Sequence, residues 1–312
     1  MRPLAAAVAV LIVAGCGGGS RGITAATAKR AVELERGRAA GQVLGVAWSQ
    51  DGKTLAAGAP DGVLLLDPSS GRPKALLRTD SQVWGVAWSE DGVVAAASED
   101  GAVRAWRGLR RIAEFNVRDG PAFCVSWSGR RLAAGYADGH VIVWNVERRR
   151  AVRTLTGHTA EVIAASWSPD GRRLASGSID ATVRIRDRES ETLTRPEGAD
   201  VNGVAWSPDG RRLAAANQDG VVRVWDVDSR KVGLRLRGHE GWTRGIDWSP
   251  NGDLLASSGA DGTVRIWDAE SGKELRSVKA GGQEAWSVAW SPDGRRLASG
   301  DGDGTVGIWG LR

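Results

Sequence analysis

The chain has 312 residues, of which 42% are hydrophobic and 25% are charged, so most of it is expected to form a folded globular structure. A formal net charge of +5 is too small at this length to indicate nucleic-acid binding. Two cysteines exclude a disulfide scaffold, and three histidines leave little room for a metal centre. The unusual feature is the presence of 15 Trp beside 2 Phe and 1 Tyr, which predicts a repeated motif.

The N-terminus carries a short apolar run, from Leu4 to Gly15, behind a single arginine. A membrane-spanning helix needs about 20 apolar residues, so this run has instead the length of a signal-peptide core. Its end, Val13-Ala14-Gly15-Cys16, resembles bacterial lipoprotein signals, in which cleavage leaves the cysteine as a lipidated N-terminus. The resemblance implies a signal peptide over 1–15 and a flexible tether over 16–29, lipidated at Cys16. A secretory signal cleaved elsewhere is the alternative.

After this leader, a Trp-Ser pair recurs seven times at intervals of 39 to 42 residues. The tryptophans are Trp48, Trp88, Trp127, Trp167, Trp206, Trp248 and Trp290. Each repeat divides into four short runs separated by turn residues, which in the sixth repeat are 231–236, 243–249, 254–258 and 263–268. Repeats of about 40 to 45 residues with four strands each are typical of propeller blades.

Four dipeptides, Gly157-His158, Gly238-His239, Trp225-Asp226 and Trp267-Asp268, resemble motifs of the WD-repeat β-propeller family. The resemblance covers nearly all of residues 30–312. It implies an all-β fold, a seven-bladed β-propeller of four-stranded antiparallel blades.

The same resemblance implies a buried structural network in each well-formed repeat. The sixth repeat alone has all four of its residues, His239, Ser257, Asp261 and Trp267. In the fourth repeat Arg186 replaces the tryptophan.

The last repeat is one strand short, because the sequence stops just after Trp309 in the third run of that repeat. Residues 31–35 resemble the outer run 234–237 of an earlier blade. We therefore expect an N-terminal strand to complete the last blade and close the ring, which removes an open sheet edge.

One position, four residues before each core tryptophan, rims the central channel on the top face in the WD-repeat family. Most side chains there are apolar, and Trp is the leading anchor residue at protein interfaces. The predicted partner-binding set is Leu44, Trp84, Phe123, Ile163, Arg244 and Trp286, with Trp242 nearby. Acidic residues two positions earlier, Glu161, Asp200 and Glu284, favour a partner segment with some positive charge. A simple plug of the channel mouth is the alternative.

Arginine pairs follow the turn after the first strand of four repeats, at 130–131, 172–173, 211–212 and 295–296. With the basic residues after the third strand they predict a basic bottom face. This face is either a solvated turn surface or a surface attracted to anionic headgroups.

No nucleophile–base pair, metal-ligand set or phosphate loop is found, so we predict no catalytic residues, metal or cofactor. The expected protein is a monomeric, non-enzymatic scaffold at the bacterial cell envelope. It would be held by lipid on the extracytoplasmic side of a membrane and would bind an extended protein segment, and no nucleic acid. The alternative is an enzymatic or small-ligand-binding propeller that uses the central channel, where Asp247 is the one charged residue.

Overall fold

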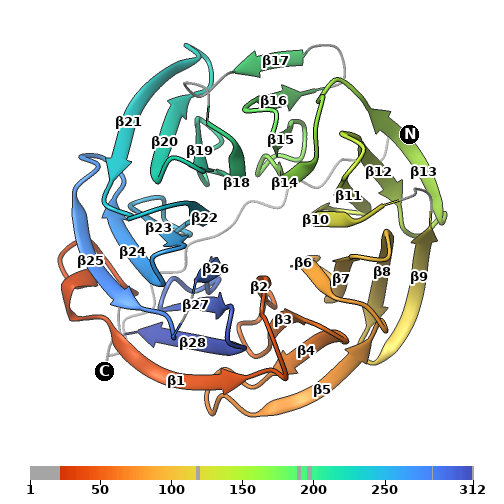
Figure 1. Ribbon diagram of the computed structural model, residues 1–312, viewed down its shortest axis with the longest axis horizontal. Helices are drawn as coiled ribbons and strands as arrows, with labels where there is room; N and C mark the ends of the chain where they lie inside the picture. The colour runs from red at the N-terminus through yellow and green to blue at the C-terminus, as the bar shows by residue number, and fades with distance from the viewer. Residues whose placement is uncertain (1–21, 117–119, 188–190, 195–198, 283, 311–312) are drawn as a thin grey trace, which may run out of the picture.

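The computed structural model describes residues 22–116, 120–187, 191–194, 199–282 and 284–310. The chain forms a ring of seven four-stranded antiparallel sheets around a central axis (Figure 1). The prediction of an all-β, seven-bladed propeller is therefore confirmed. Within the described ranges the only helix is the short 3-10 turn η1 (Ala28–Arg30), and none has the length and apolar character that crossing a membrane requires.

Each blade runs from an innermost to an outermost strand, and the next blade starts again at the centre (Figure 1). The first three blades are β2 (Gly45–Trp48), β3 (Leu55–Ala59), β4 (Gly62–Leu66), β5 (Pro73–Arg78); β6 (Val83–Trp88), β7 (Val93–Ser98), β8 (Ala102–Arg107), β9 (Arg110–Asn116); β10 (Ala122–Ser128), β11 (Arg131–Tyr136), β12 (Val141–Asn145), β13 (Arg150–Leu155). The next three are β14 (Val162–Trp167), β15 (Leu174–Ser178), β16 (Val183–Arg186), β17 (Glu191–Thr194); β18 (Val201–Trp206), β19 (Arg212–Asn217), β20 (Val221–Asp226), β21 (Lys231–Arg237); β22 (Thr243–Trp248), β23 (Leu254–Gly259), β24 (Thr263–Asp268), β25 (Glu274–Lys279). The seventh consists of β26 (Ala285–Trp290), β27 (Arg296–Asp301), β28 (Thr305–Gly310) and β1 (Val32–Arg38).

The second strand of each blade is buried on both sides because it lies between two neighbouring blades. Every residue of β3, β7, β15 and β23 is buried, and most of these residues are Ala, Ser, Gly or Leu. Small side chains allow adjacent sheets to pack closely at these positions.

We call the face with the turns after the first and third strands the bottom face, and the opposite face the top face.

The ring closes through its two ends. Strand β1 pairs antiparallel with β28, with Val32 opposite Gly310 and Arg38 opposite Thr305. Figure 1 shows β1 on the outer side of β28. The expected closure by an N-terminal strand is confirmed, with the strand lying at 32–38 rather than 31–35.

The residues before β1 also belong to the packed structure. Ile23 is only 3% exposed, and with Ala28 it packs in one apolar cluster with Leu254 and Trp290. The Ile23 main-chain N–H donates to the Gly294 carbonyl at 2.9 Å. The described part of the predicted tether, 22–29, is therefore folded onto the bottom face, because its apolar side chains cover the ring of Trp290. The predicted signal peptide over 1–15 and Cys16 lie outside the described residues.

The core tryptophans join neighbouring blades. In four blades the indole N–H donates to a main-chain carbonyl in the innermost strand of the preceding blade, at 3.0 to 3.2 Å. These pairs are Trp48 with Ala289, Trp127 with Ala87, Trp206 with Ser166, and Trp248 with Ala205. Each such bond satisfies a polar atom of a large apolar side chain, so the indole can be packed between blades without an unpaired donor.

Four junctions also carry an arginine clamp, by which we mean a guanidinium over the core tryptophan of the next blade. The clamps are Arg131 over Trp167, Arg173 over Trp206, Arg212 over Trp248 and Arg296 over Trp48, at 4.4 to 4.7 Å from the ring centre. Three of these guanidiniums also donate to a glycine carbonyl in the next blade, at Gly171, Gly210 and Gly52. The second member of each of these arginine pairs therefore does not belong to the predicted basic bottom surface, because its guanidinium stacks on an indole of the next blade.

Removal of residues 1–38 would take away β1 and the segment that covers Trp290. We expect the melting temperature to fall by about 10 °C or more, since β28 becomes an open edge and buried apolar surface is exposed. Thermal unfolding followed by circular dichroism measures the change. Removal of residues 1–21 alone is the matched control, and an equal melting temperature for the two shortened chains would contradict this account of closure.

Candidate functional site

The predicted rim residues lie at the start of the innermost strands. Trp84, Phe123 and Ile163 are in β6, β10 and β14, whereas Arg244 and Trp286 are in β22 and β26. The structure groups four of the five around two centres, one at blades two and three and one at blades six and seven. These strands lie on opposite sides of the central axis (Figure 1).

The first centre is an aromatic pair. The rings of Trp84 and Phe123 are 5.3 Å apart and meet edge to face at 80°. Both side chains are half-buried, so each keeps some surface toward solvent. An edge-to-face pair holds both rings in a defined orientation, which favours a preformed contact surface.

The second centre is a stack around Arg244. Its guanidinium lies 4.5 Å from the ring centre of Trp242 and 3.9 Å from that of Trp286. It also forms a 2.6 Å ion pair with Glu284. Trp242 is 43% exposed and is one of the few large apolar side chains with that much exposure among the described residues. The arginine therefore orients two tryptophans at the rim, a role that the sequence pattern did not reveal.

Two members of the predicted set contribute differently. Leu44 is only 8% exposed, so its side chain belongs to the packing between blades and offers little surface to a partner. Ile163 is half-buried and is an aliphatic member of the set. The aromatic members of the predicted set thus form two centres, and Leu44 adds little surface between them.

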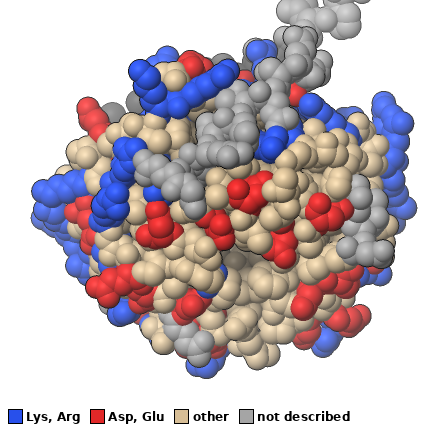
Figure 2. Space-filling view, turned by 45° about the horizontal axis from the view of Figure 1, so that its top comes forward, with Lys and Arg blue, Asp and Glu red and all other residues tan. Residues whose placement is uncertain are grey.

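Acidic side chains surround the central opening in the space-filling view, whereas Lys and Arg lie mostly toward the outside (Figure 2). Glu284 belongs to the second centre through its ion pair with Arg244. Glu161 precedes β14 and is half-buried. A negative potential around an opening attracts cationic groups and repels anionic ones.

Asp247 in β22, the charged residue of the predicted channel lining, joins two blades. One carboxylate oxygen accepts the Trp290 main-chain N–H at 2.7 Å, and the other accepts the Trp248 N–H at 2.9 Å. Burial raises the pKa of Asp247 to about 7, although both hydrogen bonds act in the opposite direction. Ser126, in the third blade, accepts the Trp167 main-chain N–H of the fourth blade in the same way. These bonds give Asp247 a structural role between inner strands.

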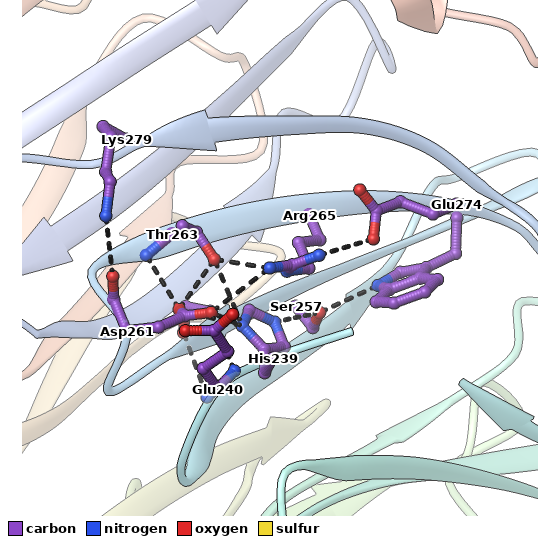
Figure 3. A network of polar contacts seen from close by, with 11 residues as sticks. His239, Glu240, Ser257, Asp261, Thr263, Arg265, Glu274 and Lys279 are labelled. Carbon is purple, nitrogen blue, oxygen red and sulfur yellow. Dashed lines mark hydrogen bonds and ion pairs between the residues drawn. The ribbon is translucent and has the colours of Figure 1, made fainter. Parts of the chain in front are cut away.

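The four network residues of the sixth blade are brought together (Figure 3). Ser257 Oγ lies 2.8 Å from His239 Nε2 and accepts the Trp267 indole N–H at 2.8 Å. His239 Nδ1 lies 3.1 Å from an Asp261 carboxylate oxygen. Thr263 donates its hydroxyl to Asp261 at 2.7 Å. The network ties the loop before β22 to strands β23 and β24.

The charges in this network are set by burial and by hydrogen bonds. Burial lowers the pKa of His239, against the raising effect of Asp261. Burial works against the charged form of Asp261, yet hydrogen bonds from Thr263 and the Glu240 main chain hold its pKa well below the usual range. A neutral imidazole beside a carboxylate is thus the resting state at neutral pH.

Other chemically versatile groups are engaged or enclosed. Burial raises the pKa of the Cys124 thiol to about 12, which makes it unreactive. In the part of the chain that the structure describes, no three His, Cys, Asp or Glu side chains gather in a way that could hold a metal ion.

Sequence comparisons give the family. The profile of the WDR19 first beta-propeller matches residues 44–200, and that of the WD domain, G-beta repeat, matches 189–226, 230–268 and 272–310. The chain belongs to the WD-repeat β-propeller family. Membership indicates a protein-binding scaffold and is consistent with a non-enzymatic role.

Several curated relatives are similar over part of the chain. WD repeat-containing protein 90 from Homo sapiens is 33% identical over 101 residues, which is 29% of this chain and 6% of that protein. Protein HIRA from Oryza sativa subsp. japonica is 33% identical over 124 residues, 29% of this chain and 13% of that protein. The B-type cell cycle switch protein ccs52B from Medicago truncatula is 34% identical over 155 residues, 46% of this chain and 32% of that protein. The chain thus spans a third or less of these eukaryotic relatives.

Replacement of Ser257 by alanine should destabilise the propeller by about 2–4 kcal/mol, because His239 and Trp267 both lose a buried partner. Ser299→Ala is the matched control. Ser299 is in the same position of the seventh blade and is buried, and its hydroxyl has no partner among the described residues. Its replacement should cost less than about 1 kcal/mol. Chemical unfolding measures both changes, and equal costs would contradict the role given to the network.

Proposed function

We propose that this protein is a scaffold that captures an extended segment of a partner protein across the top rim. The observation that carries the proposal is the pair of aromatic centres on opposite sides of the channel. Trp84 and Trp286 are the main anchors, one in each centre. Phe123, Trp242 and Arg244 hold these anchors in place and add contact surface.

The chemistry of the rim defines the segment. Half-buried tryptophans on a rigid ring offer large apolar contacts at a low cost in conformational entropy. A segment that reaches both centres must cross the channel in an extended form, because a compact turn covers less distance per residue. The acidic side chains around the opening favour basic residues in the part that crosses it (Figure 2).

The proposal is tested with a random peptide library selected on the intact protein. We expect enriched peptides to combine apolar and basic residues, and to bind the Trp84→Ala/Trp286→Ala variant at least about tenfold more weakly. The measurement is the Kd of the enriched peptides by isothermal titration calorimetry.

The matched control is Leu109→Ala, which removes a side chain that is 72% exposed in the turn after β8, on the bottom face. This variant should bind the peptides as the natural chain does. Peptides that bind the double tryptophan variant with undiminished affinity would refute rim capture.

We further propose that the protein is attached by lipid at Cys16 to the extracytoplasmic side of a bacterial membrane. The support is the position of Cys16 directly after the apolar run 4–15. Ile23 bonds to the bottom-face turn at Gly294, so the described part of the chain begins on the bottom face. An anchor on that side leaves the top rim free for a partner.

Attachment is tested by fractionation of bacterial cells that express the full chain. The natural chain should sediment with membranes and be released only by detergent, and Cys16→Ser should be released as soluble protein. Cys124→Ser is the control, since that thiol lies within the folded ring and should not affect attachment. Membrane retention of Cys16→Ser equal to that of the natural chain would disprove lipidation.

A further inference from the structure

The seven junctions between blades share one position on the bottom face. In the four clamped junctions the second-strand residue at this position is an arginine. The residue after each arginine pairs with the core tryptophan of its own blade. For example, Leu132, which follows Arg131, pairs with Trp127. In the second blade the same position holds Val93. Val93 pairs with Arg107 just as Arg131 pairs with Asn145 and Arg212 with Asp226. A clamp to Trp127 is therefore missing at the junction of blades two and three.

Another junction shows that the protein fills this place when the arginine is missing. In the sixth blade the position holds Leu254, and Ile23 and Ala28 of the N-terminal segment pack in the same apolar cluster as Leu254 and Trp290. The Ile23 N–H donates to Gly294, the counterpart of the glycines that accept bonds from the clamps. At the junction of blades one and two, Thr54 holds the position, and Lys74 donates to its hydroxyl and to the Lys53 carbonyl.

At the junction of blades two and three there is instead a cavity of about 450 Å³, within the usual range for ligand pockets of roughly 300–1,000 Å³. We call it the Trp127 cavity. Its apolar lining is Val93, Ile112, Trp127 and Val146. Among the described residues no cation lies over the ring of Trp127, whose N–H is already used by the Ala87 carbonyl.

The mouth of the Trp127 cavity is charged. Asp91 pairs with Arg107 at 2.7 Å, and Glu147 pairs with Arg130 at 2.9 Å. All four side chains are more than half exposed, and such surface pairs are weak enough to exchange partners. Glu90 and Arg149 complete the charged lining, which thus has three carboxylates and three guanidiniums. Acceptors for a cationic side chain are thus placed around an indole face.

From these features we infer that the Trp127 cavity is a docking site for an arginine side chain of a partner protein. The incoming guanidinium stacks on Trp127, and its methylene groups contact Val93 and Ile112. Gly129, at φ 55°, lines the cavity from the turn after β10, and Gly171, at φ 65°, accepts the Arg131 clamp from the corresponding but longer turn of the next blade. The incoming side chain thus repeats between two proteins a contact that this chain makes four times within itself.

Arginine fits this cavity better than an aliphatic or anionic group. A planar guanidinium can stack on an indole and donate to a carbonyl and a carboxylate at the same time. This inference is independent of the proposed rim function, because the cavity is on the bottom face. It also lies across the ring from the blades onto which residues 22–31 are folded, so that segment leaves it accessible (Figure 1).

The test uses the full chain labelled with 5-fluorotryptophan and observed by fluorine NMR. The Trp127 resonance is assigned through Trp127→Phe. The probes are the acetylated amides of arginine, citrulline and norleucine, and inorganic phosphate. We expect saturable shifts of the Trp127 resonance with arginine amide, and affinities at least about fivefold weaker for citrulline and norleucine, which lack the cationic group.

The variant Val93→Arg restores the missing clamp. The turn between the first two strands is short in the second blade, which carries Val93, and even shorter in the third blade. The third blade still places Arg131 over Trp167, so a short turn does not prevent a clamp. We expect this variant to melt at a higher temperature and to lose the arginine-amide response. Val93→Ala is its matched control and should keep the response.

Four outcomes would overturn the inference. Norleucine amide that binds as well as arginine amide indicates an aliphatic site, and a response to phosphate but not to arginine amide indicates an anion site. An arginine-amide response that persists in Val93→Arg places the binding elsewhere. A response that appears only in Arg130→Ala shows that Arg130 of the same chain occupies the cavity.

Discussion

The contact between each core tryptophan and the preceding blade is the interaction on which the ring depends. A single four-stranded sheet of this kind cannot bury both of its apolar faces, so every blade needs two neighbours. The indole fills the space at the junction, and at four junctions its N–H also bonds to a carbonyl of the inner strand before it. Because the ring is closed, blades must pack against each other at all seven junctions at once.

The fold could be predicted from the sequence because its signal is repeated. Seven Trp-Ser pairs at nearly equal intervals determine the number of blades, and turn residues at regular positions divide each repeat into strands. The outer strand from the N-terminus was also predictable, since the last repeat lacks one strand and β1 has a matching pattern. At these places the turn and strand signals within each repeat agree with the spacing of the repeats, and such agreement makes a prediction reliable.

The site was less predictable because it depends on contacts between repeats. The order of residues along the chain indicates that Arg244 and Trp286 start inner strands, but it does not show that the guanidinium lies between two indoles. Likewise, Arg130 and Arg131 are adjacent in sequence and have different environments. One is at the surface with Glu147, and the other stacks on Trp167 in the next blade. Leu44 fits the rim pattern and is nevertheless buried, because burial depends on neighbouring blades.

Ile23 and Ala28 form no recognisable pattern along the chain, yet they cover Trp290 where an arginine is absent. The N-terminal residues therefore substitute for a side chain that the sixth blade does not supply.

The pairing of β1 with β28 has a consequence for the order of folding. During synthesis β1 leaves the ribosome before the other strands of the ring and β28 leaves after them, so every other strand must be made before the seventh sheet is complete. Until then β1 has no partner and the growing arc of blades ends in an exposed inner strand, a state that favours mispairing between nascent chains. Completion of the circle is therefore a late, long-range step, and premature termination leaves an arc that cannot close on itself.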